Sequence, residues 1–459
     1  MNTSHTVVSL ALVSLGWLVA CGGDNPGTGP NTTITVSGLV RERGGEPMSG
    51  VQVVVAGKSP VTTDADGRFS IPGVAVPYDL TVMLTSSNTA LVYKGLTRAD
   101  PALLSLDFSG ADQTATISGT TPPTSGPVTF VFFQSGRHVI GGGVADAATG
   151  QYAITPSWRG SATARPGQLY ALQFTRGPTP LPASYNGYAS KPLTITPGGD
   201  FAGNNFAAAD LIDPLEQSIG GTVTVPASYS LTFRRLYLFF GRVPLIWTEQ
   251  APLPNAFTYT VPAVGGVVFG VATWSVDPAS RESFFFKQGL SGNSSNAGVP
   301  LEPAAQLGLP LDGAASVDAA TPFTWGQGGG SGVNLFEVIP ADASNPTFFV
   351  FTMGSDAKIP DLAGAGMALP ASASYRWFVD RVFPVSSVNE VAAEGFLRFV
   401  DLETGDLGET VSEGRSFTTR AAPGTAFRGS AVGPTAVASH SPHRRGWMLT
   451  RDPISMDGR

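Results

Sequence analysis

The stretch from Ile34 to Val82 reads ITVSGLVRERGGEPMSGVQVVVAGKSPVTTDADGRFSIPGVAVPYDLTV. Apolar and polar residues alternate in Ile34–Val36 and again in Val51–Val53, which is the period-two pattern of strands with one buried face. The DADG sequence at 64–67 predicts a tight turn, in which an aspartate caps its own backbone and Gly67 adopts a positive φ. The stretch therefore predicts short antiparallel strands, joined by turns and packed as a β-sandwich.

The order of these parts resembles the carboxypeptidase regulatory-like domain. The matching pieces are VSGLV at 36–40, PMSGVQV at 47–53 and TTDADGRFSI at 62–71. The resemblance implies a transthyretin-like sandwich of the starch-binding-like superfamily, which we expect over residues 34–112. It implies a fold and no reaction, because this domain is the accessory module of the peptidases and their zinc-binding catalytic domain has no counterpart in the sequence.

Length and composition indicate several all-β domains. A chain of 459 residues is too long for one ordinary core. It has 56 glycines and 37 prolines, and only 13% of its residues are charged, which favours sandwiches with frequent turns over helical bundles. The net charge of −7 provides no large basic surface, so we expect no nucleic-acid partner.

Two divergent copies of the first pattern follow it. ATISG at 115–119 repeats ITVSG, and DAATGQYAI at 146–154 repeats DADGRFSI. A third copy begins with IGGTV at 219–223 and continues with YTVPAV at 259–264, in which Tyr259 aligns with Phe69. Repeats of this length are whole domains rather than solenoid turns. We therefore predict a second sandwich over 113–215 and a third over 216–314.

The last folded part has a different pattern. Four strands are predicted at PFTW (322–325), VNLFEVI (333–339), YRWFV (375–379) and RSFTT (415–419). The early aromatic and the late Tyr-x-Trp resemble a fibronectin type III-like sandwich, which we expect over 315–420. The glycine-rich stretch at 326–332 is followed by a strand and not by a helix, so we interpret it as a connector and not as a phosphate cradle.

The predicted fold class is therefore all-β, a string of transthyretin-like and immunoglobulin- or fibronectin-like β-sandwich domains with a signal peptide and a tail. The tail, residues 421–459, is rich in alanine, proline, glycine and serine and has no periodicity. This composition predicts disorder.

The N-terminus predicts export. Val7–Leu18 is apolar over a length too short to span a bilayer about 30 Å thick. The sequence LVAC at 18–21 then resembles a bacterial lipobox, so we interpret 1–21 as a lipoprotein signal peptide and 22–33 as a flexible tether. The alternative is an ordinary signal peptide cleaved near Ala20. The resemblance implies lipidation at Cys21, a membrane anchor in the cell envelope and, because Gly22 follows, the outer membrane.

Candidate catalytic groups are few. Cys21 is the only cysteine, so no internal disulfide or cysteine-based catalysis is expected. His138 is the only histidine outside the terminal segments, and neither G-x-S-x-G nor H-E-x-x-H occurs. We interpret His138 as a turn or strand-edge residue. A calcium loop at 64–67 would need an acidic residue at its twelfth position, which is Ala75. We expect no catalytic residue, metal or cofactor.

Aromatic residues are the remaining candidates for a binding site. Trp158, Tyr185 and Tyr188 lie among glycine, proline and serine, which predicts loops, and aromatic rings on loops can stack on sugars. The alternative is that these rings belong to the core. The favoured function is a non-catalytic, lipid-anchored envelope protein with structural or adhesive domains that bind envelope proteins or glycans. A carbohydrate-binding surface lipoprotein is the alternative, and an enzyme or a hydrolase accessory protein is less favoured.

Overall fold

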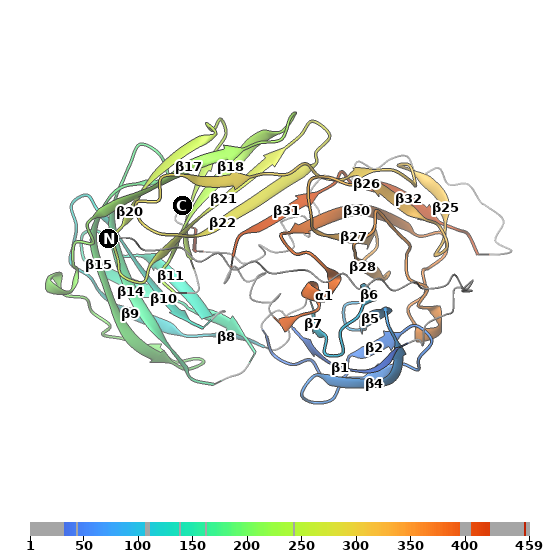
Figure 1. Cartoon of the computed structure of the whole chain (residues 1–459). Coiled ribbons are helices and arrows are strands. Elements are labelled where there is room, and N and C mark those ends of the chain that lie inside the picture. The colour runs from blue at the N-terminus through green and yellow to red at the C-terminus, as the bar shows by residue number, and fades with distance from the viewer. Residues whose placement is uncertain are drawn as a thin grey trace, which may run out of the picture.

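The computed structural model describes residues 32–42, 45–105, 111–136, 139–160, 163–241, 244–394, 405–422 and 454–455. Within these ranges nearly all regular structure is β (Figure 1), and the helical elements are α1 (Val388–Val391) and two 3₁₀ turns, η1 (Ala208–Asp210) and η2 (Ala363–Ala365). The all-β fold class with several sandwich sheets is confirmed.

The first sandwich has seven strands in two sheets. They are β1 (Thr33–Arg41), β2 (Gln52–Val55), β3 (Val61–Thr62), β4 (Arg68–Ala75), β5 (Tyr78–Leu84), β6 (Thr89–Leu96) and β7 (Ala102–Leu104). One sheet has the order β4-β1-β7, with β1 antiparallel to β4 and parallel to β7. The other strands follow the order β3-β2-β5-β6.

The predicted turn at 64–67 is confirmed. The amides of Asp66 and Arg68 donate to Asp64 Oδ1 at 2.9 and 2.8 Å, and Gly67 has a φ of 72°. The second copy uses a similar arrangement, since the amides of Ala148 and Thr149 donate to Asp146 Oδ1 at 3.1 and 2.8 Å. In both copies, an aspartate that accepts hydrogen bonds from the amides of its own turn thus precedes the next strand, which is β4 in the first copy.

The second and third sandwiches repeat this seven-strand plan. The second contains β9 (Thr116–Thr120), β10 (Val128–Ser135), β11 (Val139–Val144), β12 (Gln151–Ile154), β14 (Arg165–Arg176), β15 (Pro182–Ile195) and β16 (Asp200–Phe201). The third contains β17 (Glu216–Thr224), β18 (Ser230–Phe239), β19 (Pro244–Gln250), β20 (Ala256–Pro262), β21 (Val268–Val276), β22 (Glu282–Leu290) and β23 (Ala297–Pro300). Their smaller sheets have the orders β12-β9-β16 and β20-β17-β23, and their larger sheets include β15-β14-β10-β11 and β22-β21-β18-β19. The second also adds β13 (Ser157–Arg159) and β8 (Asp112–Thr114) beside β11.

A glycine opposite an aromatic residue recurs in the small sheet of each copy. The facing pairs are Gly38 with Phe69, Gly119 with Tyr152, and Gly221 with Phe257. The third strand of each small sheet runs parallel to the strand that carries the glycine. A Cβ added to the glycine would lie within 2.7 Å of a backbone carbonyl oxygen in or close to that third strand. The predicted alignment of Tyr259 with Phe69 is therefore wrong by two residues, because Tyr259 faces Ile219.

The fourth sandwich has another topology. Its strands are β24 (Gln306–Leu307), β25 (Ala314–Val317), β26 (Phe323–Gly326), β27 (Val333–Pro340), β28 (Thr347–Thr352), β29 (Asp356–Ala357), β30 (Ser374–Phe383), β31 (Leu407–Val411) and β32 (Arg415–Thr419). One sheet has the order β24-β26-β29, and the facing strands follow β28-β27-β30, with β32 beside the first half of β30. All four predicted strands are confirmed, and the glycine-rich stretch connects β26 to β27 as expected.

Three sandwiches share one sheet. Fifteen strands, among them β33 (Ile454–Ser455), are joined in a sheet whose main path is β3-β2-β5-β6-β28-β27-β30-β31-β22-β21-β18-β19-β33. The path passes from the first sandwich to the fourth and then to the third, so the order in space differs from the order along the chain. Figure 1 shows the result as two halves, with the first and fourth sandwiches in one, the second and third in the other, and β31 between them.

Several predictions concern residues that lie outside the described ranges or in the tail. Cys21, His138, the signal peptide and nearly all of the tether lie outside the described residues. Within the tail that was predicted to be disordered, Ile454–Ser455 form β33, which pairs in parallel with β19, so that prediction is wrong for these two residues. No helix in the described part of the chain is long and apolar enough to cross a membrane.

Candidate functional site: the junctions between sandwiches

The three aromatic residues predicted to bind sugar lie on strands, so the loop prediction is wrong. Trp158 lies on β13 and is 4% exposed, in the core cluster between the two sheets of the second sandwich. Tyr185 and Tyr188 lie on β15, where Tyr185 is 2% exposed and Tyr188 is half-buried, and both belong to a different cluster. The structure brings the two tyrosines together and places Trp158 apart from them.

The tyrosine cluster is the junction between the second and third sandwiches. Phe240, which directly follows β18, packs against three rings on β10, β14 and β15. Its ring centroid lies 5.5 Å from Phe132, 5.8 Å from Tyr170 and 5.6 Å from Tyr188. Such offset and tilted arrangements are favourable for aromatic pairs. Of the three rings predicted to stack on a sugar, Tyr188 is therefore covered by a phenylalanine of the same chain.

Polar groups fix the same phenylalanine. Gln134 Nε2 and the Tyr170 hydroxyl donate to the carbonyl oxygen of Phe240 at 2.9 and 2.7 Å. A second ring contact, between Phe174 and Trp247 at 5.9 Å, continues the junction along β19. Because the carbonyl oxygen of Phe240 accepts two buried hydrogen bonds, the backbone between β18 and β19 is fixed against the second sandwich as well as the ring.

A sequence signal for this junction exists in the runs VTFVFF (128–133) and LYLFF (236–240). Apart from Thr129 these runs are apolar, and they do not alternate, which is typical of strands buried on both faces. In β18, Leu236 and Leu238 join the cluster of the third sandwich, whereas Tyr237 and Phe239 join the cluster that includes the first. The alternation rule used for the other strands does not detect such residues.

The first and fourth sandwiches meet strand to strand. Strand β6 pairs in parallel with β28 from Thr89 opposite Thr347 to Tyr93 opposite Phe351. The Tyr93 and Phe351 rings stack at 5.0 Å. Asn389, in α1, closes the other end of the junction, because its carbonyl oxygen accepts from an arginine of the first sandwich at 2.8 Å. Parallel pairing between separate domains continues the backbone ladder across the boundary.

Strand β31 joins the fourth sandwich to the third by pairing with β30 on one side and β22 on the other. Arg381 of β30 is 2% exposed at this junction. Its guanidinium donates to the Glu302 carboxylate and to the carbonyl oxygens of Gly329 and Gly330, so the glycine connector holds a buried cation. Burial lowers the pKa of Arg381, and the negative charge of Glu302 opposes this effect. Removing either partner would leave an uncompensated buried charge.

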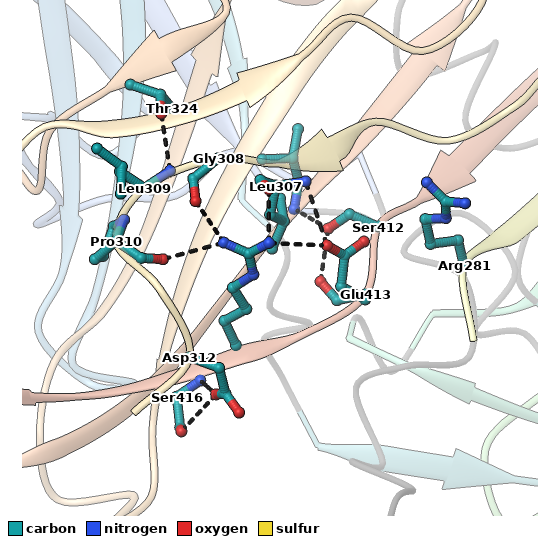
Figure 2. Close-up of polar contacts among 12 residues, drawn as sticks. Arg281, Leu307, Gly308, Leu309, Pro310, Asp312, Thr324, Ser412, Glu413 and Ser416 are labelled. Atoms are coloured by element: carbon teal, nitrogen blue, oxygen red, sulfur yellow. Dashed lines mark hydrogen bonds and ion pairs between the residues drawn. The ribbon is translucent and has the colours of Figure 1, made fainter. Parts of the chain in front are cut away.

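A second arginine fixes the segment from β24 to β25 at the start of the fourth sandwich (Figure 2). Arg415 donates to the carbonyl oxygens of Leu307, Gly308 and Pro310 at 2.6, 2.5 and 3.3 Å. Asp312 accepts at 2.7 Å from both the amide and the hydroxyl of Ser416, and these hydrogen bonds lower the pKa of Asp312. A planar guanidinium with several donors suits such a set of carbonyl groups, and the segment between β24 and β25 is thereby attached to β32.

The polar side chains at these junctions hold neighbouring parts of the chain together. Among the described residues no three histidine, cysteine or acidic side chains are grouped so as to hold a metal ion. Other buried charges are paired in the same manner; Arg234 donates to Glu249 Oε2 at 3.1 Å, and the Tyr259 hydroxyl donates to the same oxygen at 2.5 Å. Each of these charged groups is therefore bound by another side chain of the protein and has a structural role.

Comparison with solved structures finds distant similarity. The chain is similar to the major pilin subunit BcpA of Bacillus cereus, with 7% identity over 59% of this chain and 99% of that one, at a TM-score of 0.15. It is also similar to the TIE protein of Bacillus anthracis, with 10% identity over 58% of this chain and 50% of that one, at a TM-score of 0.16. At such TM-scores the whole chains do not superpose, and we infer nothing about function from them.

Comparison of sequences is informative for one segment. No curated protein matches the chain. Residues 35–106 match the carboxypeptidase regulatory-like domain family, and they correspond to the first sandwich from β1 to β7. The match and the fold together therefore assign a carboxypeptidase regulatory-like domain to residues 35–106, and the resemblance predicted for this segment is confirmed.

Proposed function

We propose that this protein is a non-catalytic, lipid-anchored protein of the bacterial cell envelope whose sandwiches form one rigid scaffold for structural or adhesive contacts. The observation that carries the proposal is the shared sheet. Ordinary domain interfaces within a chain permit relative motion unless they are large and apolar. Here the boundaries are made of paired strands and buried aromatic rings, which supports a fixed arrangement.

The anchor in this proposal is Cys21. The eleven residues from Gly22 to Thr32 precede β1 and, fully extended, would span at most about 40 Å. The scaffold would then be held within that distance of the membrane, and we propose the outer membrane. The fourth sandwich would act as a fibronectin type III-like domain, and the partner would be another envelope protein or a glycan.

Replacing Cys21 by serine tests the anchor. Wild type should incorporate a palmitate analogue and sediment with membranes, whereas Cys21→Ser should do neither. Gly22→Ser is the matched control, since it changes the neighbouring residue and keeps the thiol, and it should remain labelled. A Cys21→Ser protein that stays in the membrane fraction would exclude lipid anchoring at this residue.

X-ray scattering of the lipid-free Cys21→Ser protein tests the scaffold. A rigid arrangement predicts a compact profile that one conformation explains. Profiles that require several relative positions of the sandwiches would contradict a shared sheet. Turnover of peptidase, esterase or glycosidase substrates by the same sample, reduced by His138→Ala, would contradict the non-catalytic part of the proposal.

A further inference from the structure

The outer edge of β19 is paired with a strand from a distant part of the chain. Strand β19 lies next to the end of the fifteen-stranded sheet, with β18 on its inner side. On its outer side β33 pairs in parallel, with Leu245 opposite Ile454 and Ile246 opposite Ser455. The strand that covers this edge is therefore separated from β19 by more than two hundred residues of sequence.

The edge strand equivalent to β19 is protected from further pairing in a different way in each of the three copies. In the first sandwich the edge strand β3 is only two residues long. In the second, β11 is covered by β13 of the same sandwich, and β8 lies beyond it. In the third, β19 is seven residues long, and β33 is the strand that pairs with its outer side among the described residues. Unpaired edge groups are a template for another strand, so a long edge needs a cover.

The tether to β33 is long. Thr419 ends β32 and Ile454 begins β33, so 34 residues separate the two strands. The entropy cost of closing a loop rises slowly with its length, so a tether of this size neither forces the contact nor prevents it. The position of Ile454–Ser455 on β19 therefore reflects pairing at the edge and not the constraint of a short connection.

The sequence around β33 suits a short added strand. It reads GWMLTRDPISMDGR from 446 to 459, with large apolar residues that are sparse in the preceding tail. Pro453 stands directly before the strand, and proline is tolerated at the first position or at the edge of a sheet but not in a central strand. The segment can thus pair on one side and end the sheet on the other.

We propose that the outer edge of β19 is a binding site for an extended peptide segment, and that its occupant is the C-terminal segment 446–459 of the same chain. Addition of a strand to an exposed sheet edge derives its affinity from main-chain hydrogen bonds. Because 34 residues separate β33 from the end of β32, β33 forms a removable cover. This inference rests on the fold and does not depend on the lipid anchor.

Amide hydrogen exchange tests the cover. The samples are the full lipid-free chain, a chain that ends at Arg445, and the full chain with Ile454→Pro, which removes a backbone N–H from β33. In both altered chains the β19 amides should exchange about tenfold faster, which corresponds to the loss of about one net hydrogen bond. Val437→Pro, in the same tail but outside the strand, should change nothing. Equal exchange of β19 in the full and shortened chains would overturn the proposal.

Binding in trans tests the site and its occupant. A labelled peptide of residues 446–459 should bind the shortened chain saturably, and the same peptide with Ile454→Pro should not. The full chain should bind the peptide at least tenfold more weakly, because its own segment occupies the edge. If the peptide does not bind the shortened chain, the edge is not a peptide site. If light scattering shows that the full chain is a dimer and the shortened chain a monomer, the occupant comes from a second copy, and the proposal of a cover within one chain is wrong.

Discussion

Replacing Phe240 by alanine should separate the second sandwich from the third. Phe240 is 6% exposed, and its ring contacts Phe132, Tyr170 and Tyr188 of the second sandwich. Its carbonyl oxygen, which accepts two buried hydrogen bonds, is retained in Phe240→Ala. The substitution therefore removes the ring from the junction and leaves the polar contacts in place.

The expected cost follows from burial and ring contacts. Truncating a buried phenylalanine to alanine costs about 3–5 kcal/mol. Three aromatic neighbours, at about 0.5–1.5 kcal/mol for each favourable pair, place Phe240→Ala in the upper part of that range. Phe240→Leu keeps most of the apolar surface and loses the ring, so it should cost about 1–1.5 kcal/mol.

Thermal unfolding of the lipid-free protein measures this cost. For a unit of about 200 residues, 1 kcal/mol shifts Tm by about 2–4 °C, so Phe240→Ala should lower the transition of the second and third sandwiches by roughly 6–20 °C. Hydrogen exchange should rise in β10, β14 and β15 and remain unchanged in β1 and β4. A loss below about 1 kcal/mol, or an equal loss in the first sandwich, would refute the assignment of Phe240 as the anchor of this junction.

Four further substitutions test local features. Gly150→Ala should cost about 2–5 kcal/mol in urea denaturation, because its φ is 72° and a Cβ would lie 1.8 Å from a backbone oxygen; Gly160→Ala, at a φ of 97° with nothing within 4 Å, should cost only about 1–2 kcal/mol. Arg415→Lys should speed proteolysis of the segment between β24 and β25 with little change in Tm, since one ammonium group cannot serve three carbonyl oxygens. Asp312→Asn should be less stable than wild type at pH 7, and acid titration should show the difference disappearing below about pH 4. The reason is that hydrogen bonds from Ser416 lower the pKa of Asp312 in the folded state, so its stabilising effect is present above the unfolded pKa and is lost as the pH falls through the folded one.

Local features of the fold could be predicted from the sequence. Alternation in β4 identifies the core residues Phe69 and Ile71, and the DADG turn requires only its own aspartate and a glycine that tolerates a positive φ. Both depend on residues close together in the chain. The repeats were detectable for the same reason, although their smaller similarity moved the third alignment by two positions.

Contacts between sandwiches could not be predicted in the same way. Tyr188 is half-buried because Phe240, more than fifty residues away in the chain, covers it. Nothing near Tyr188 in the sequence distinguishes that outcome from an exposed ring. The apolar runs that do not alternate indicate that a second face needs a partner, but the partner itself depends on how separate sandwiches meet.

The three copies share one plan, and the apolar outer faces of their larger sheets explain why the order in space departs from the order along the chain. The outer face of the first, which includes Met83 and Val92, packs with strands of the fourth sandwich. The outer face of the second receives Phe240 of the third. A face of this kind destabilises a separate domain, because its apolar surface stays in contact with water until another domain covers it. The same residues that would destabilise the first or the second sandwich alone therefore join it to its neighbour in space.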